Sequence, residues 1–370
     1  MDRGITAEIS LDALSHNLEA VAGLSSRRPV IAVVKADAYG HGAVEISKRL
    51  EKEGVEYLAV AFTGEARELR EAGIGAKILV LFDHDAGDIF RYHLIPVVGD
   101  RKAAAALSRE AAKAGVQAHV QIKVDTGMGR LGISGDAVKE IAEIANLGNL
   151  HIDGVMSHFS EADLADTSFA REQLRKFKTL RDGLERSGLK VRTLHIANSA
   201  AVMALPEAHF DAVRPGIMLY GYSPLSTPRA SLPMLKPVMS ARTRLVALRR
   251  LPAGTPVSYG RTFVTKRESL IGVMAAGYAD GFDRRFSNNA EVLVRGKRVP
   301  VVGRVCMDLS MLDLTDVDEV MDNDEVVIIG TQGGESMDAA ELAQRAGAIP
   351  YEILTSLGSR ARRVYLDFAS

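Results

Sequence analysis

Eight short apolar runs alternate with longer helix-like segments over the first two-thirds of this 370-residue chain, and this alternation constrains the fold more than any other feature. Helical periodicity is clear in residues 102–114, 137–146 and 169–186. Strands that are apolar throughout and separated by helices predict a parallel sheet covered on both faces. The eight predicted strands are residues 30–35, 57–61, 77–82, 94–98, 118–124, 152–157, 193–197 and 212–218.

This pattern favours the α/β class and an N-terminal (β/α)8 barrel of the TIM type, a fold that takes about 250 residues. A doubly wound open sheet is the alternative that the same pattern allows. The predicted barrel domain comprises residues 1–232. In such barrels the catalytic groups lie at the carboxyl ends of the strands.

The pattern changes after the eighth predicted strand. Residues 223–237 are rich in proline and serine, which predicts a linker. Strand-like runs follow with few helices between them, so residues 233–370 are predicted to form a mainly antiparallel β domain. One helix is predicted at residues 338–346, with Ser336 as its N-cap. The predicted strands are residues 243–248, 270–276, 291–295, 299–302 and 325–329.

Composition excludes several classes of protein. The 46 basic residues are balanced by 47 acidic residues, whereas a protein that binds nucleic acid or acidic membranes is expected to carry a basic excess. The single cysteine, Cys306, excludes an internal disulfide framework. The chain shows neither the apolar core of a signal peptide nor an apolar run of about 18 residues. We therefore expect a soluble cytoplasmic protein with no nucleic-acid or membrane partner.

The most informative segment is residues 33–42, Val-Val-Lys-Ala-Asp-Ala-Tyr-Gly-His-Gly. Lys35 closes the first predicted barrel strand, and a glycine-rich turn follows. A lysine at this place can simply mark where a buried strand reaches water. It also stands where barrel enzymes carry catalytic groups, and a partly desolvated amine suits a Schiff base with an aldehyde cofactor.

Residues 127–132, Gly-Met-Gly-Arg-Leu-Gly, match the glycine pattern of dinucleotide-binding proteins. That pattern requires a helix to open within the turn, whereas here residues 133–135 intervene before the next predicted helix. Arg130, at the end of the fifth predicted strand, instead suits a bidentate contact with a carboxylate or phenolate.

Polar groups and a glycine gather at the ends of the last three predicted barrel strands, in residues 157–158, 195–199 and 214–217. Each group has a structural explanation on its own, such as a buried histidine with satisfied hydrogen bonds. Together they lie where barrels hold a phosphate with backbone N–H groups and hydroxyls. A lysine on the first strand that faces such a site predicts pyridoxal phosphate. We expect no metal site, because no helix carries a histidine pair at i, i+4 spacing with carboxylates.

Seven segments of the chain resemble the alanine racemases, in the order in which that family carries them and in both predicted domains. The resemblance implies a barrel, a C-terminal β domain, the cofactor pyridoxal 5′-phosphate and racemisation of alanine, with D-alanine supplied to peptidoglycan synthesis. The matching segments are residues 34–42, 123–132, 195–200, 214–217, 257–260, 277–281 and 303–308.

The resemblance also implies roles for single residues around the cofactor. Lys35 would hold it covalently, and Arg214 would contact its pyridine nitrogen with His158 beside it. The other implied cofactor-binding residues, most of them at the phosphate, are Tyr39, Asn198, Ser199, Gly216 and Ile217.

A homodimer with shared active sites is implied as well, in which the C-terminal domain contributes to the partner subunit's site. Tyr259 would act as a base opposite Lys35, and Met307 would bind the substrate carboxylate through its backbone N–H. Arg130 would reach the same carboxylate. Lys123 matches a position that is carbamylated in some members of the family.

Other functions stay open at this point. A racemase of broader amino-acid specificity fits the same motifs. A barrel-type amino-acid decarboxylase is disfavoured, since those enzymes carry a carboxylate where Arg214 stands. A non-catalytic pyridoxal-phosphate-binding protein would resemble the barrel alone. One position departs from the family: Ser359 appears where some members have a tyrosine on the cofactor phosphate.

Overall fold

The computed structural model describes residues 4–227 and 229–367. Positions 1–3, 228 and 368–370, which fall within the predicted domains and linker, lie outside the described residues. The chain divides into two compact units. The barrel unit comprises Leu14–Ala38 and Ala43–Lys236, and the C-terminal unit comprises the chain up to Ala13, Tyr39–Gly42 and the chain from Pro237 onward.

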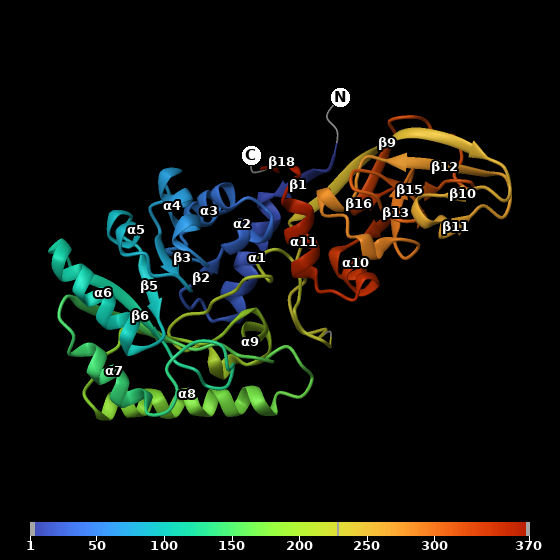
Figure 1. Cartoon of the computed structure of the whole chain (residues 1–370). Helices are drawn as coiled ribbons and strands as arrows, with labels where there is room; N and C mark the ends of the chain where they lie inside the picture. Colours follow the sequence, from blue (N-terminus) through green and yellow to red (C-terminus); the bar gives the residue numbers. More distant parts are fainter. Residues whose placement is uncertain (1–3, 228, 368–370) are drawn as a thin grey trace. The chain divides into compact units, whose positions relative to one another are not determined.

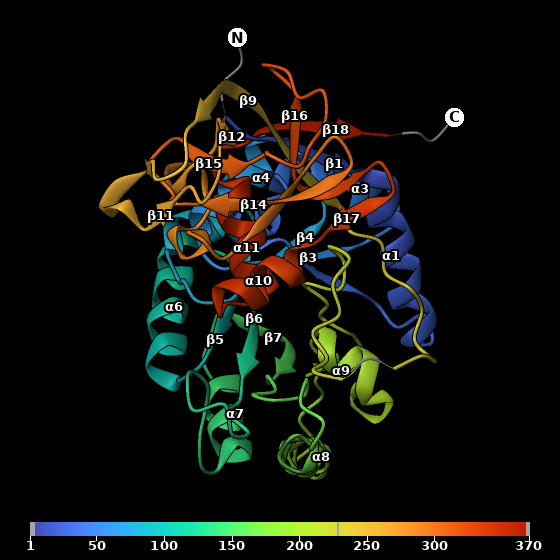
Figure 2. The same cartoon turned by 90° about the vertical axis from the view of Figure 1, so that its right-hand side faces the viewer.

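The barrel unit contains a parallel sheet in which seven strands lie side by side in chain order. Helices lie outside these strands in Figure 1, and Figure 2 shows α6, α7 and α8 beside β5, β6 and β7. The strands are β2 (Ile31–Val33), β3 (Tyr57–Val60), β4 (Lys77–Val80), β5 (Ile95–Val98), β6 (Ala118–Lys123), β7 (Leu150–Met156) and β8 (Thr193–His195). The helices are α3 (Ala43–Lys52), α4 (Thr63–Glu71), α5 (Ala86–Arg91), α6 (Arg101–Ala114), α7 (Ala137–Ala145), α8 (Ser168–Arg186) and α9 (Ser199–Ala204), together with α1 (Leu11–Leu24), which crosses from one unit into the other.

The eighth predicted strand, residues 212–218, is not a regular strand. Its backbone nevertheless closes the barrel, because the Ile31 N–H donates to the Val213 carbonyl at 2.8 Å and the Arg214 N–H donates to the Ala197 carbonyl at 2.8 Å. Pro215 has no N–H to continue such a ladder, which explains why residues 212–218 do not form a regular strand. The closure excludes the open-sheet alternative and confirms the predicted barrel.

The C-terminal unit is built on a nine-stranded sheet that is antiparallel except where β1 pairs with β18. The long strand β9 pairs with β12 along its second half and with β1 and β16 along its first half. Its pairing with β16 closes a ring with β13, β14, β15 and β12. The strands are β1 (Thr6–Ser10), β9 (Met239–Leu251), β12 (Ser269–Met274), β13 (Glu291–Val294), β14 (Lys297–Val302), β15 (Ser310–Asp313), β16 (Glu325–Gln332), β17 (Glu335–Met337) and β18 (Arg362–Leu366), with the short pair β10 (Pro256–Val257) and β11 (Phe263–Val264) beside them in sequence.

Two helices follow in this unit, α10 (Ala339–Ala346) and α11 (Pro350–Gly358). The predicted N-cap Ser336 is wrong, since that residue lies in β17. The cap is Asp338, whose carboxylate accepts the Glu341 N–H at 2.8 Å. Within residues 4–227 and 229–367, no helix combines the length and apolar character that crossing a bilayer requires.

Candidate active site

Lys35 lies just beyond the carboxyl end of β2, at the start of a left-handed turn, α2 (Lys35–Tyr39). Ala36, Asp37 and Ala38 all have φ near 52° and ψ near 50°. This conformation costs about 1–2 kcal/mol for each residue other than glycine. The turn is held by the Ala36 N–H, which donates to the Glu65 carboxylate at 2.6 Å. Backbone strain of this kind is common at functional sites.

Arg130 is placed by a loop that folds back on the end of β6. The Asp125 N–H donates to the Ile133 carbonyl at 2.9 Å, and the Ile133 N–H donates to the Lys123 carbonyl at 2.9 Å. The Asp125 carboxylate accepts the backbone N–H groups of residues 127, 128 and 129 at 2.8–2.9 Å. These N–H groups are therefore occupied, and no helix opens in the turn. The glycine pattern is not a dinucleotide site.

Three cationic groups surround the ring of Phe82, which follows β4. The distances to the ring centroid are 5.5 Å from Lys35 Nζ, 5.7 Å from Lys123 Nζ and 5.8 Å from Arg130 Cζ. Attraction to an aromatic face offsets only part of the repulsion among three positive charges. This end of the barrel is therefore suited to an anionic ligand.

Burial, followed by this crowding of positive charges, lowers the pKa of both lysines. Burial lowers the pKa of Lys35 most, and the charge of Arg130 lowers it further, while Glu65 acts in the opposite direction. Burial and then Arg130 lower the pKa of Lys123 to about 8. A larger fraction of each amine is neutral near pH 7 than for an ordinary lysine, and a neutral amine can act as a base or nucleophile.

The buried guanidinium of Arg214 bridges two histidines. Its Nη1 lies 2.6 Å from His195 Nδ1, and its Nη2 lies 3.0 Å from His158 Nδ1 and 2.8 Å from the Ser157 carbonyl oxygen. A guanidinium only donates hydrogen bonds, so both Nδ1 atoms must accept. Burial and the charge of Arg214 hold the pKa of each histidine well below its ordinary value. Both imidazoles are therefore neutral, with the proton on Nε2.

Gln121, which the sequence analysis did not select, completes this network. Since His195 carries its proton on Nε2, it donates to Gln121 Oε1, which lies 2.6 Å away. A Cβ at Gly154 would lie 3.2 Å from Gln121 Cδ and 2.8 Å from the Thr193 carbonyl oxygen, so glycine leaves room for this side chain. Gln121 thereby fixes the tautomer of His195 that Arg214 requires.

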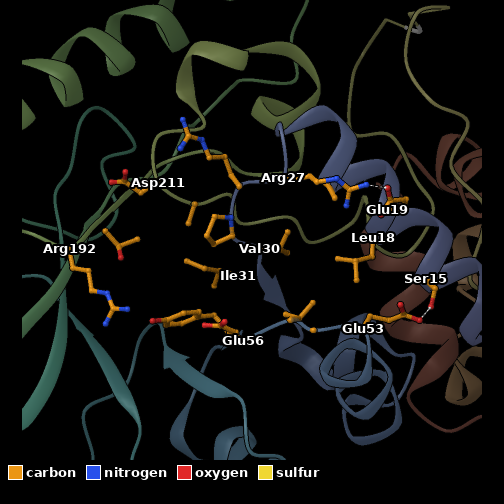
Figure 3. Close-up of a pocket in the computed structure, with 18 of the residues that line it drawn as sticks. Ser15, Leu18, Glu19, Arg27, Val30, Ile31, Glu53, Glu56, Arg192 and Asp211 are labelled. Atoms are coloured by element: carbon orange, nitrogen blue, oxygen red, sulfur yellow. Dashed lines mark hydrogen bonds and ion pairs between the residues drawn. The ribbon is translucent and has the colours of Figure 1, made fainter.

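Gln121 is also among the residues that line a cavity of about 550 Å³ at the amino ends of the strands (Figure 3). Some of the charged groups that line it are paired: Glu19 pairs with Arg27 at 2.6 Å, and Asp211 accepts the Leu194 N–H at 2.8 Å. Catalytic groups of barrels lie at the opposite ends of the strands, so this cavity is not the candidate active site.

We predict that Gln121→Leu lowers the free energy of unfolding by about 1–3 kcal/mol, since the buried Nε2–H of His195 loses its acceptor. Gln117→Leu, a change at an exposed position just before β6, is the matched control and should stay within about 0.5 kcal/mol of the native protein. Denaturant unfolding measures both values. Equal stability of the two variants would contradict the assigned tautomer.

The last strand ends form a small polar cradle. The Ser199 hydroxyl oxygen accepts the N–H of Gly216 at 2.8 Å and that of Met218 at 3.4 Å. Asn198 caps α9, since its side-chain oxygen accepts the Ala201 N–H at 3.0 Å. Backbone N–H groups and a hydroxyl are the donors that bind a phosphate in barrels. Ile217, which follows Gly216 in the chain, is buried.

The remaining predicted site residues lie in the C-terminal unit. Tyr259 is 71% exposed and Met307 is 55% exposed. Their loops are joined, because the Ser258 hydroxyl donates to the Arg304 carbonyl at 2.6 Å. The ring of Tyr39 lies 5.7 Å from that of Tyr351.

Ser359, the position that departs from the family, follows α11. Its hydroxyl donates to the Ser356 carbonyl at 2.8 Å, so it is engaged at the helix end.

Two family profiles match the chain. Residues 9–224 match "Alanine racemase, N-terminal domain" and residues 238–365 match "Alanine racemase, C-terminal domain". The boundary between the two matches falls within the segment that joins the barrel to β9.

Individual proteins are similar over the whole length. The chain is 53% identical to the alanine racemase of Thermodesulfovibrio yellowstonii over 99% of both chains. It is 44% identical to that of Halothermothrix orenii over 97% of this chain and 96% of the relative. The solved alanine racemase of Clostridium difficile aligns with a TM-score of 0.94 at 34% identity, covering 99% of this chain and 97% of that one. The alanine racemase of Bacillus anthracis, solved with bound L-Ala-P, aligns with a TM-score of 0.92 at 36% identity, covering 100% of this chain and 97% of that one.

Proposed function

The chain belongs to the alanine racemase family and interconverts L- and D-alanine with pyridoxal 5′-phosphate, and we propose that Lys35 and Tyr259 are the two bases of this reaction. The observation that carries the assignment of Lys35 is its place at the carboxyl end of β2, among the cations around Phe82. The D-alanine produced supplies peptidoglycan synthesis.

The donor set of the barrel unit fits the cofactor. Lys35 would hold it, Arg214 would contact its ring nitrogen beside His158, and Arg130 would face its phenolic oxygen. The excess of cations suits its phosphate and its ring oxygen, and the Ser199 hydroxyl, which accepts two backbone N–H groups, keeps its own proton to donate to the phosphate. When bound, pyridoxal phosphate supplies an electron sink that acidifies the Cα–H of an amino acid. The proposed contacts at the phosphate come from Tyr39, Ser199, Gly216 and Ile217, and Asn198 is a further proposed cofactor-binding residue.

Racemisation removes a proton from one face of Cα and returns one to the other. Two bases on opposite faces do this without moving far. A base must be neutral before it accepts a proton, and the lowered pKa of Lys35 increases its neutral fraction near pH 7. The hydroxyl of Tyr259 is proposed as the second base.

Arg130 and Met307 are proposed to bind the substrate carboxylate, the first by its guanidinium and the second by its backbone N–H. Lys123 is proposed to react with carbon dioxide, since an amine whose pKa is about 8 is partly neutral at physiological pH. The neutral amine would form an N–C bond to carbon dioxide and release one proton to solvent, and the resulting carbamate would carry a negative charge beside Arg130 and orient its guanidinium.

Tyr259 and Met307 are proposed to act in the partner subunit of a homodimer. Both are large apolar side chains that a single chain leaves exposed, and Tyr278 and Leu309 are exposed in the same unit. Exposed apolar groups of this kind mark interaction surfaces. Residues 233–370 would thus complete the site of the second chain. A cytoplasmic location and the lack of a nucleic-acid partner stay predictions from the sequence.

Arg214 is proposed to direct the reaction toward racemisation. A guanidinium keeps its own proton and repels a proton on an adjacent ring nitrogen, and both neighbouring histidines are neutral. A less protonated ring is a weaker electron sink, which disfavours transamination.

We predict that Arg214→Glu slows racemisation by about 10²–10³-fold, as for the loss of a preorganised charged donor, and increases pyruvate formation from alanine. A carboxylate at this place favours protonation of the ring nitrogen and raises the pKa of His158 and His195. Arg214→Lys keeps the charge and is the control that should not increase pyruvate. Unchanged pyruvate formation in Arg214→Glu contradicts the role given to the arginine.

Chiral analysis of products tests the function directly. Incubation of the holoenzyme with L-alanine should give D-alanine up to an equal mixture. L-serine and L-lysine test a broader racemase, and formation of an amine tests the decarboxylase alternative. Binding of the cofactor without turnover of any of the three amino acids would support a non-catalytic protein instead.

A further inference from the structure

A cluster of two histidines and a carboxylate lies on β6 and β7, away from the residues proposed for catalysis. His119 of β6 is in register with His151 of β7. The Asp153 carboxylate lies 3.0 Å from His119 Nδ1 and 3.4 Å from His151 Nε2. The two imidazole rings are 5.1 Å apart and meet edge to face.

β7 carries a bulge beside this cluster. Val120 pairs with Ile152 but Gln121 pairs with Gly154, so Asp153 is an extra residue between them. A bulge bends its strand and redirects one side chain. Here Gly154 takes the place beside Gln121, and the carboxylate of Asp153 turns back toward the two imidazoles.

The cluster has the composition and spacing of a transition-metal site. Two imidazoles and one carboxylate bind zinc and related divalent ions, with bonds of about 2.0–2.2 Å and a fourth position left to water. Tetrahedral bonds of that length place ligand atoms about 3.3 Å apart. Both contacts of Asp153 are close to this separation, and all three ligand atoms lie within 4.8 Å of one another. Both histidine side chains are about half exposed, which leaves them room to rotate toward this separation.

We propose that His119, His151 and Asp153 bind one divalent transition-metal ion of the zinc type. The ligands come from two hydrogen-bonded strands. The pairing of β6 with β7 already places His119 beside His151. His119 precedes Lys123 by four residues of extended strand, about 13 Å. The ion would therefore join the amino ends of β6 and β7 without touching the cationic groups at the other end.

The test is calorimetric titration of the untagged holoenzyme with Zn²⁺, repeated with Co²⁺, whose visible d–d bands report the coordination number and geometry of the bound ion. We expect one ion per chain. His119→Ala, His151→Ala and Asp153→Asn should each weaken binding at least tenfold, since each removes one of three ligands. Racemase activity without added metal should be unchanged in all three variants, which confirms that they fold.

His93→Asn is the matched control, since His93 is an exposed histidine outside the cluster and asparagine tolerates its φ of 51°. It should bind zinc as the native protein does. No uptake by the native protein, or uptake that persists in all three cluster variants, overturns the proposal and leaves the cluster as a hydrogen-bonded contact between two strands.

Discussion

Lys35→Ala is expected to abolish racemisation and to remove the covalent attachment of the cofactor. The variant loses both the anchoring amine and one of the two proposed bases, and the base alone contributes about 10²–10⁴-fold. We expect the rate to fall by at least about 10⁴-fold. Absorbance of the purified protein, and borohydride reduction followed by peptide mapping, locate the attached lysine.

Lys123→Ala distinguishes the two lysines beside Phe82. This variant should keep the cofactor attached, because the proposed attachment is Lys35 at the end of β2, which the variant retains. Lys77→Ala, at an exposed position at the opposite end of a barrel strand, should leave activity unchanged. A reduced cofactor adduct in Lys35→Ala would move the attachment to another lysine and overturn the assignment.

The fold was largely predictable where a strand is buried on both faces. The first seven predicted barrel strands match β2 to β8 within a few residues, because a parallel sheet covered by helices demands continuous apolar runs. The eighth differs because Pro215 interrupts the ladder. β1 was missed for another reason: its partners β9 and β18 lie more than 200 residues away, and five residues carry too little local pattern.

The residues of the candidate site were predictable from the sequence only where the barrel pattern gives their position a meaning. Lys35 and Arg214 were selected because they stand at predicted strand ends, where the barrel fold gives position a meaning. Gln121 was missed because a polar residue inside an apolar strand has no signature until the register places it against His195. Helix spacing does not reveal the pair of His119 and His151, because these residues meet through strand pairing, which the sequence does not state.

Tyr259→Phe is expected to reduce racemisation by about 10²–10⁴-fold, the usual contribution of a general base, while cofactor binding and the proposed dimerisation persist. Phenylalanine keeps the ring and removes only the hydroxyl. Tyr92→Phe, which removes a hydroxyl bonded to Glu71 on the barrel surface, is the matched control and should retain full activity. Racemisation must fall in both directions, because one equilibrium constant links them.

The exchange of the Cα proton with solvent deuterium separates the two bases in this variant. By family resemblance Tyr259 takes the proton from L-alanine and Lys35 takes it from D-alanine. Lys35 is intact in Tyr259→Phe, so D-alanine should still lose its Cα proton to solvent, whereas L-alanine should keep it. Equal exchange from both enantiomers would mean that one mobile base serves both faces. Tyr259 would then have no catalytic role, and its exposure would be explained by the proposed dimer interface alone.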